Sequence, residues 1–240
     1  MILFLLIISV AFVAAIPSQT PNRNPPRPSP TLAWSESVID ETGTTDPNPA
    51  AAIGPDGLPW ILYSKGNGIR VARPASPGSG CTNTAWRCET IVDVPAEGYG
   101  EGSDFALGPG AAPTAVFSRN SGGFYSMVFA NRTAGGWWQR HPVANDFIPL
   151  ALDFDPTGRP VVAYQDVNGI SVGVARYVGA GGTGCSLATN WTCREVDPGS
   201  GLTGYGADIL LDSADVEHLV YSDADTAVLQ YAKSVGNGGN

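Results

Sequence analysis

The stretch Leu152-Asp-Phe-Asp-Pro-Thr-Gly-Arg-Pro-Val-Val-Ala-Tyr164 decides the fold, because the chain repeats it in related form. In each copy an apolar residue is followed by a polar turn and then by an alternating segment that ends on an aromatic residue. The turns of the four copies are Ile53–Pro59, Leu107–Pro113, Phe154–Pro160 and Leu211–Glu217. Gly, Asp and Ser in the turn and Pro at the start of a strand suit hairpin geometry. Each copy therefore predicts a β-hairpin.

A second signal recurs with the same period. Tryptophans stand at steps of 52, 52 and 53 residues, and each is followed four or five residues later by a β-branched residue. The tryptophans are Trp34, Trp86, Trp138 and Trp191, and the β-branched residues are Val38, Ile91, Val143 and Val196. A repeat this long is a supersecondary unit that buries its apolar face by stacking on its neighbours. No helical period is sustained over ten residues, so the sequence predicts an all-β protein.

Each unit holds four short strands, including the strand that begins at Trp. Four-stranded units of about 40 to 55 residues are typical of β-propeller blades, whereas the coils of a β-solenoid, the rival fold, are shorter. The sequence thus predicts a β-propeller of four-stranded antiparallel blades built from four repeats of about 52 residues.

The phase of the repeat predicts how the ring closes. A long Gly-rich and acidic connection, such as Asp93 to Ser103, follows each Trp strand and gives the chain length to return to the centre. The Trp strands are therefore the outermost strands of the preceding blades, and the strand at Trp34 is left to complete the last blade. The alternative is a piece of a longer propeller, because Val235–Asn240 resembles Val178–Thr183, which leads into the next Trp strand.

The first part of the chain differs in composition from the rest. Residues 1–15 have the apolar core and small residues of a secretory signal peptide, and they are shorter than the roughly 20 residues that a membrane anchor needs. Residues 16–32 form a Pro-rich linker, and residues 33–240 form the propeller. We expect a secreted, extracellular or periplasmic protein with no membrane span after cleavage of the signal.

The cysteines and the charge limit the kinds of site. Cys81 with Cys88 and Cys185 with Cys193 are two local pairs, which in a secreted chain predict two disulfides rather than a zinc site. A net charge of -9 excludes nucleic acid and anionic membranes as expected partners. We expect no metal and no cofactor.

The repeats resemble those of secreted bacterial β-propeller proteins of unknown function. The resemblance rests on the strand with Trp, any residue and Cys, and on the segment Asp155-Pro-Thr-Gly-Arg-Pro160 that leads to Tyr164. It covers about residues 34–240 and implies the architecture but no activity. Pro55-Asp-Gly-Leu-Pro-Trp60 is more distantly similar to the Asp-box of sialidase-like propellers, which is a structural turn in that family.

Four residues are candidates for a ligand site: Tyr99, Asp104, Tyr205 and Asp208. Asp104 and Asp208 share one repeat position on strands expected to line the channel, in blades two and four. Gly98-Tyr-Gly100 and Gly204-Tyr-Gly206 repeat each other on connections, where a tyrosine is a typical sugar or protein contact. The plainer interpretations are a polar channel lining and tyrosines that pack over the blade end.

No catalytic residue is predicted. His141 and His218 are the only histidines, and no motif for nucleophilic or metal catalysis occurs. We therefore expect a secreted, non-enzymatic propeller that binds an extracellular glycan or protein through loops on one face. The alternatives are a propeller-type glycoside hydrolase or lyase that uses Asp104 and Asp208, and an inactive fragment of a larger cell-surface propeller protein.

Overall fold

A computed structural model describes residues 35–41, 48–94, 97–168, 170–198, 203–223 and 225–235, with the side chains of 203–205 excepted. The chain divides into two compact units, Met1–Ser37 and Val38–Asn240. The predicted signal peptide, nearly all of the linker region and Trp34 lie outside the described residues. Within the described part, no helix is long and apolar enough to cross a membrane.

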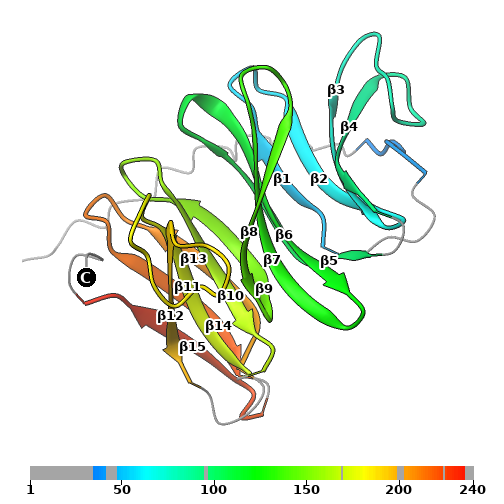
Figure 1. Cartoon of the computed structure of the whole chain (residues 1–240). Coiled ribbons are helices and arrows are strands. Elements are labelled where there is room, and N and C mark those ends of the chain that lie inside the picture. The colour runs from blue at the N-terminus through cyan, green and yellow to red at the C-terminus, as the bar shows by residue number, and fades with distance from the viewer. Residues whose placement is uncertain are drawn as a thin grey trace, which may run out of the picture. The chain divides into compact units, whose positions relative to one another are not determined.

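The unit Val38–Asn240 is all β, as the sequence predicts, with four antiparallel sheets that follow one another in chain order (Figure 1). Sheet 1 contains β1 (Ala50–Ile53), β2 (Pro59–Lys65), β3 (Gly68–Pro74) and β4 (Trp86–Asp93). Sheet 2 contains β5 (Gly98–Gly108), β6 (Ala112–Ser121), β7 (Phe124–Arg132) and β8 (Trp138–Asn145). A short 3-10 turn, Pro109–Ala111, joins β5 to β6.

Sheet 3 repeats this order with β9 (Phe147–Phe154), β10 (Pro160–Asp166), β11 (Ser171–Tyr177) and β12 (Trp191–Asp197). Sheet 4 has three strands among the described residues: β13 (Thr203–Leu211), β14 (Glu217–Asp223) and β15 (Val228–Lys233). The hairpins predicted at the four repeated turns are confirmed, as are Trp86, Trp138 and Trp191 at the starts of the fourth strands.

Three of the four predicted turns close through a hydrogen bond of their own backbone. In sheets 1, 3 and 4 the N–H of Gly54, Asp155 and Asp212 donates to the carbonyl four residues later. Asp155 also accepts hydrogen bonds from the N–H groups of Thr157 and Arg159 through Oδ1. An aspartate whose side chain accepts hydrogen bonds from the backbone N–H groups that follow it stabilises a turn. Asp155 is therefore a turn residue.

Three apolar cores lie between consecutive sheets. Leu62 of sheet 1 packs with Phe117 of sheet 2, and Val116 of sheet 2 packs with Tyr164 of sheet 3. The third core joins Val174 of sheet 3 to residues of sheet 4. Burying one large apolar side chain contributes about 1.5–3 kcal/mol, so the stacking that the repeat predicts holds the sheets together.

The fourth strand of each complete sheet carries a β-bulge at the fifth residue after its Trp. The unpaired residues are Ile91, Val143 and Val196, where the pairing register shifts. By this spacing the matching residue after Trp34 is Ile39. The tryptophan repeat predicts Val38, four residues after Trp34, as the counterpart of Ile91, Val143 and Val196. This prediction is one residue off, because the bulge is visible only in the pairing of the strands.

Both predicted disulfides are confirmed, Cys81–Cys88 and Cys185–Cys193. Each closes a loop between the third and fourth strands of its sheet, in sheets 1 and 3. The loops also reach the neighbouring strand end: Ser186 Oγ accepts the N–H of Asn145 at the end of β8 over 2.7 Å.

Candidate functional site

The first strands of all four sheets border one pocket of about 420 Å³, which we call the axial pocket. Its lining comes from β1 and the residues before it, from β5, from β9 and from β13. The lining residues are Asn48–Ala51, Glu101–Asp104, Pro149, Leu150, Gly206 and Ala207. Four sheets that follow one another in the chain thus share one site.

Irregular pairing of the first strands shapes this pocket. In β5 the register shifts between Tyr99 and Ser103, and in β13 it shifts between Thr203 and Ala207. A shift in β9 leaves Leu150 without a partner on β10. Bulges turn side chains away from the regular pleat and are frequent beside binding sites. Three first strands are therefore irregular where they border the pocket.

Gly102 lets the bulge of β5 lie directly on β9. A Cβ at Gly102 would meet Pro149 O at 2.2 Å and Ile148 Cγ2 at 2.4 Å. No side chain fits at that distance, because real contacts are at van der Waals separation. Glycine at this place is a requirement of the close approach between sheets 2 and 3.

Polar groups of the pocket join sheets 1 and 2. Asn48 Nδ2 donates to Glu101 O over 3.1 Å, and Ser103 Oγ donates to Asn48 O over 2.8 Å. Asn48 precedes β1 and the other two residues lie on β5. The side-chain oxygen of Asn48 is an acceptor at the pocket, and the carboxylate of Glu101, which accepts a hydrogen bond from the hydroxyl of Tyr125 on β7, has further acceptor sites.

Two aspartates each accept a backbone N–H from the first strand of the sheet that follows their own. Asp104 Oδ2 accepts the N–H of Leu152 over 2.7 Å, and Asp153 Oδ2 accepts the N–H of Leu211 over 2.7 Å. Each aspartate also accepts the N–H of the residue that follows it. An unpaired backbone N–H that is removed from water costs about 1–3 kcal/mol, so the caps stabilise the first strands of sheets 3 and 4.

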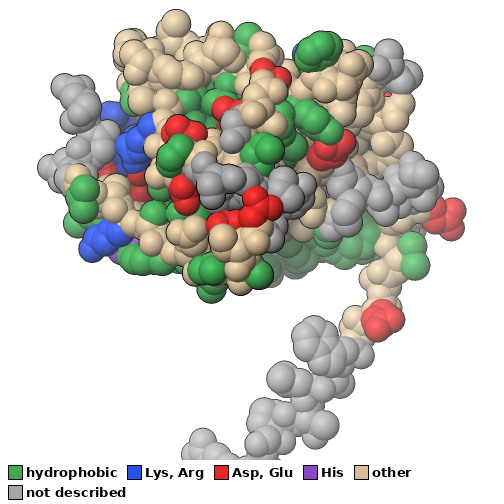
Figure 2. Space-filling model, turned by 90° about the horizontal axis from the view of Figure 1, so that it is seen from below, with side chains coloured by type: hydrophobic (Ala, Val, Ile, Leu, Met, Phe, Trp, Pro, Cys, Tyr) green, Lys and Arg blue, Asp and Glu red, His purple; other side chains and the backbone are tan. Residues whose placement is uncertain are grey.

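The field in the pocket is negative. Burial raises the pKa of Asp104 above the ordinary value; the backbone N–H groups lower it and the charges of Asp208 and Asp153 raise it. Lys, Arg and His are absent from the described lining residues. Figure 2 shows acidic side chains across the middle of one face, with Lys and Arg toward one side. The pocket therefore favours hydrogen-bond donors and cations and disfavours anions.

Asp104 and Asp208 are brought to one region, as the repeat predicts. They occupy matching register positions, opposite Val116 in sheet 2 and Val220 in sheet 4. Asp208 is exposed, and its Oδ1 accepts the N–H of Ile209. Asp104 lies within the pocket lining, and Asp208 stands one residue beyond Ala207 of that lining.

The tyrosine motifs lie within strands and not on connections. Tyr99 belongs to β5, its hydroxyl donates to Glu97, and its ring packs edge-on against Phe117 at 5.9 Å between centroids. Burial, followed by the hydrogen bond to Glu97, raises its pKa. Tyr205 lies in β13, and its side chain is outside the described part. The expected long connection after Asp93 is largely strand β5, because Gly98–Gly102 pairs and bulges instead of looping out.

Sequence reasoning missed Asn48, Glu101 and Ser103 as pocket residues. For Glu101 and Ser103 the sequence offered a signal, because they lie close to Asp104 and flank Gly102, which approaches the next sheet. Asn48 could not be found from local pattern, since its place depends on the hydrogen bonds with β5.

Other candidate chemistry lies away from the axial pocket. His141 is on β8 beside Phe129, and His218 is on β14, where Nδ1 is 2.7 Å from the hydroxyl of Tyr231. In the part of the chain that the structure describes, no group of three or more His, Cys, Asp or Glu side chains is placed to hold a metal ion.

No protein-family model matches the chain, and no curated protein sequence is significantly similar to it. The geometry of the axial pocket is therefore the basis for assigning a function.

Proposed function

We propose that this chain is a secreted, non-enzymatic propeller that binds a glycan at the axial pocket. The observation that carries the proposal is the convergence of four first strands on one acidic, polar pocket of about 420 Å³. Sugar hydroxyl groups donate hydrogen bonds to carboxylates and amide oxygens, and Glu101, Asp104 and Asn48 supply these acceptors. The two disulfides support an extracellular location.

The same proposal includes a closed ring. The four sheets are the blades, and the strand that begins at Trp34 completes sheet 4. Asp208 supports closure, because it stands in sheet 4 where Asp104 stands in sheet 2. Asp104 caps the next first strand at Leu152, so in a closed ring Asp208 meets the matching N–H of β1, that of Ala51. Ala51 borders the same pocket.

A glycan array with the purified chain tests binding, with Glu101→Gln as the pocket variant. Glu195→Gln, an exposed carboxylate outside the axial pocket, is the matched control. A hydrogen bond to a charged group contributes about 1.5–3 kcal/mol, so we expect roughly tenfold weaker binding for Glu101→Gln and parental binding for the control. Absence of any glycan signal, or equal binding by both variants, rejects the proposal; capture of a protein instead points to a protein ligand.

Glycoside hydrolysis is the second candidate, because Asp104 and Asp208 stand at matching positions of two first strands and the charge of Asp208 contributes to the raised pKa of Asp104. A general acid needs a carboxyl group that keeps its proton, and a second carboxylate must face it across the sugar. The exposed Asp208 would be the second group. Release of reducing ends from a polysaccharide panel, lost in Asp208→Asn, supports hydrolysis. No release from any substrate of the panel removes it.

A further inference from the structure

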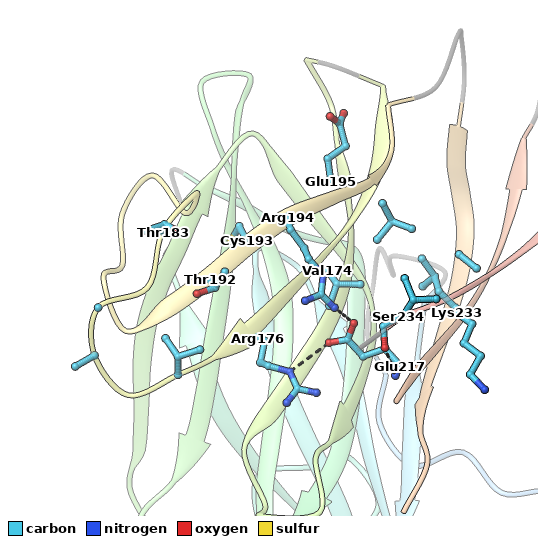
Figure 3. Close-up of a pocket in the computed structure, with 17 residues that line it drawn as sticks. Val174, Arg176, Thr183, Thr192, Cys193, Arg194, Glu195, Glu217, Lys233 and Ser234 are labelled. Carbon is cyan, nitrogen blue, oxygen red and sulfur yellow. Dashed lines mark hydrogen bonds and ion pairs between the residues drawn. The ribbon is translucent and has the colours of Figure 1, made fainter. Parts of the chain in front are cut away.

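Sheet 4 ends at β15 in the part of the chain that the structure describes. A pocket of about 770 Å³, which we call the outer pocket, lies between β11 and β12 of sheet 3 and β14 and β15 of sheet 4 (Figure 3). Its apolar floor belongs to the core between the two sheets and includes Val174, Val196, Leu219 and Ala232. Sheets 1, 2 and 3 have a fourth strand at their outer edge, and sheet 4 has none among the described residues.

In sheets 2 and 3 the tryptophan of the fourth strand packs into the core shared with the preceding sheet. Trp138 packs against the core between sheets 1 and 2, and Trp191, 1% exposed, lies in the core between sheets 2 and 3. Trp191 contacts Phe129 of the preceding sheet edge-on at 5.3 Å between ring centroids. The residue that corresponds to Phe129 in sheet 3 is Val174, on the floor of the outer pocket. The outer pocket is therefore where a tryptophan of sheet 4 would pack.

Residues 39–41 contact the disulfide loop of sheet 1. Asn83 N donates to Ile39 O over 3.0 Å, and Glu41 N donates to Thr82 Oγ1 over 3.1 Å. Thr82 and Asn83 are the two residues after Cys81 in the disulfide loop of sheet 1.

The end of β8 makes the same two contacts with the disulfide loop of sheet 3. Leu187 N donates to Val143 O over 3.2 Å, and Asn145 N donates to Ser186 Oγ over 2.7 Å. Val143 and Asn145 stand five and seven residues after Trp138, as Ile39 and Glu41 stand after Trp34. Since β8 is the fourth strand of the sheet before sheet 3, residues 39–41 lie where the fourth strand of the sheet before sheet 1 ends.

A hydrogen bond between a tyrosine and an aspartate also occurs at equivalent places in sheets 1 and 4. Tyr63 of sheet 1 donates to Asp40 over 2.9 Å, and Tyr221 of sheet 4 donates to Asp197 over 2.8 Å. Asp197 ends the fourth strand of sheet 3, six residues after Trp191, and Asp40 stands six residues after Trp34.

We infer that residues 34–40 add to sheet 4 along β15 and that the indole of Trp34 fills the outer pocket. The occupant is this segment of the chain itself, and the inference rests on the proposed closure of the ring. By the register of β11 with β12, Trp34 lies opposite Ser234 and Asp40 lies opposite Leu229, with Ile39 as the bulge. The interaction gives the outer edge of β15 a partner, and the described residues supply no other.

Hydrogen exchange at β15 tests the inference. Ser234 N donates to Glu217 O of β14, so by strand alternation the N–H groups of Lys233, Tyr231 and Leu229 point to the outer edge. We expect these three amides to exchange slowly in the purified chain, as paired amides do. Fast exchange at all three, as on an open edge, overturns the inference.

Variants identify the occupant. Trp34→Ala should raise the exchange rate of the three amides at least tenfold, and Trp34→Phe should restore part of the protection. Trp137→Ala is the matched control, because Trp137 is 78% exposed, and it should leave exchange unchanged. Protection that persists in Trp34→Ala shows that another segment covers β15 and contradicts the inference. Hydrogen exchange at β15 is measured without a glycan, so its outcome is independent of the test at the axial pocket.

Discussion

The hydroxyl of Tyr63 donates a hydrogen bond to Asp40 Oδ2 over 2.9 Å, and the ammonium of Lys65 lies 2.9 Å from the same oxygen. Thr82 adds a backbone N–H and a hydroxyl to Oδ1. The side chain of Asp40 is only 2% exposed. One aspartate before β1 thus joins strand β2 to the disulfide loop and fixes the position of residues 38–41 on sheet 1.

Asp40 makes stability depend on pH. Burial alone would raise its pKa, but the hydrogen bonds from Lys65, Thr82 and Tyr63 outweigh burial and hold the pKa well below the ordinary value. The unfolded chain takes up this proton first as pH falls, so the stabilisation is complete above about pH 5 and is lost progressively as pH falls toward the lowered pKa of the folded state.

Asp40→Asn should therefore lower the free energy of unfolding by about 2 kcal/mol at pH 7, with the difference shrinking toward pH 2. Urea unfolding of parent and variant from pH 2 to 7 measures this. Asp93→Asn, an exposed residue at the end of β4, is the control. A difference that stays constant down to pH 2 would contradict the role of the charge.

Leu229 tests whether the free face of sheet 4 is covered in solution. Its counterparts in sheets 1, 2 and 3, Ile69, Met127 and Val172, are at most 1% exposed between sheets, whereas Leu229 is 78% exposed. A face that closes against sheet 1 buries Leu229, so Leu229→Asp should cost roughly 3 kcal/mol of stability.

Phe124→Asp is the control for Leu229→Asp, because Phe124 is 74% exposed at the end of a hairpin. It should change stability by less than about 0.5 kcal/mol. Thermal and urea unfolding compare the two variants. Equal, small effects would show that the face of sheet 4 stays open.

Arg176 lies among three carboxylates between sheets 3 and 4. Its guanidinium is 2.6 Å from Asp215, 3.2 Å from Glu217 and 3.4 Å from Asp155, and the side chain is 8% exposed. Removing one partner of a buried ion pair costs about 3–5 kcal/mol, so Arg176→Ala should destabilise by that amount at pH 7. The loss should diminish in acid, because protonation removes the uncompensated charges.

Arg140→Ala, at an exposed position of β8, is the control for Arg176→Ala and should be nearly neutral. Calorimetry at pH 2 and pH 7 provides the comparison. A loss of less than about 1 kcal/mol for Arg176→Ala would argue that the network does not hold sheets 3 and 4 together.

A side chain at Gly102 should clash with sheet 3 beside the axial pocket. A methyl group at Gly102 meets Pro149 O, whereas one at Gly98 finds its nearest atom, Asn120 Cβ, at 3.6 Å. Overpacking costs about 1–3 kcal/mol, so Gly102→Ala should destabilise the chain by this amount and weaken glycan binding. Gly98→Ala should leave both unchanged within error. Equal stability of the two variants would refute the close contact of sheets 2 and 3.

The fold could be predicted from the sequence wherever local pattern determines structure. Hairpin turns, strand alternation and the Trp period are local signals, and they located the strands and the three complete sheets. The bulge five residues after each Trp could not be predicted, because it depends on pairing between strands. Val38 was therefore aligned in place of Ile39.

The candidate site was only partly accessible to the same reasoning. The repeat placed Asp104 and Asp208 at matching positions of two first strands, since register follows from the pattern. It could not show that Asp104 caps Leu152 or that Tyr99 packs on Phe117, because both contacts depend on how neighbouring strands meet.

If the axial pocket binds the ligand, amide chemical-shift mapping by NMR should locate the ligand there. The strongest binder from the glycan array is titrated into labelled protein. We expect the largest shifts on residues 48–51, 101–104 and 206–208. Shifts confined to the disulfide loops, residues 81–88 and 185–193, or to the outer pocket would contradict it.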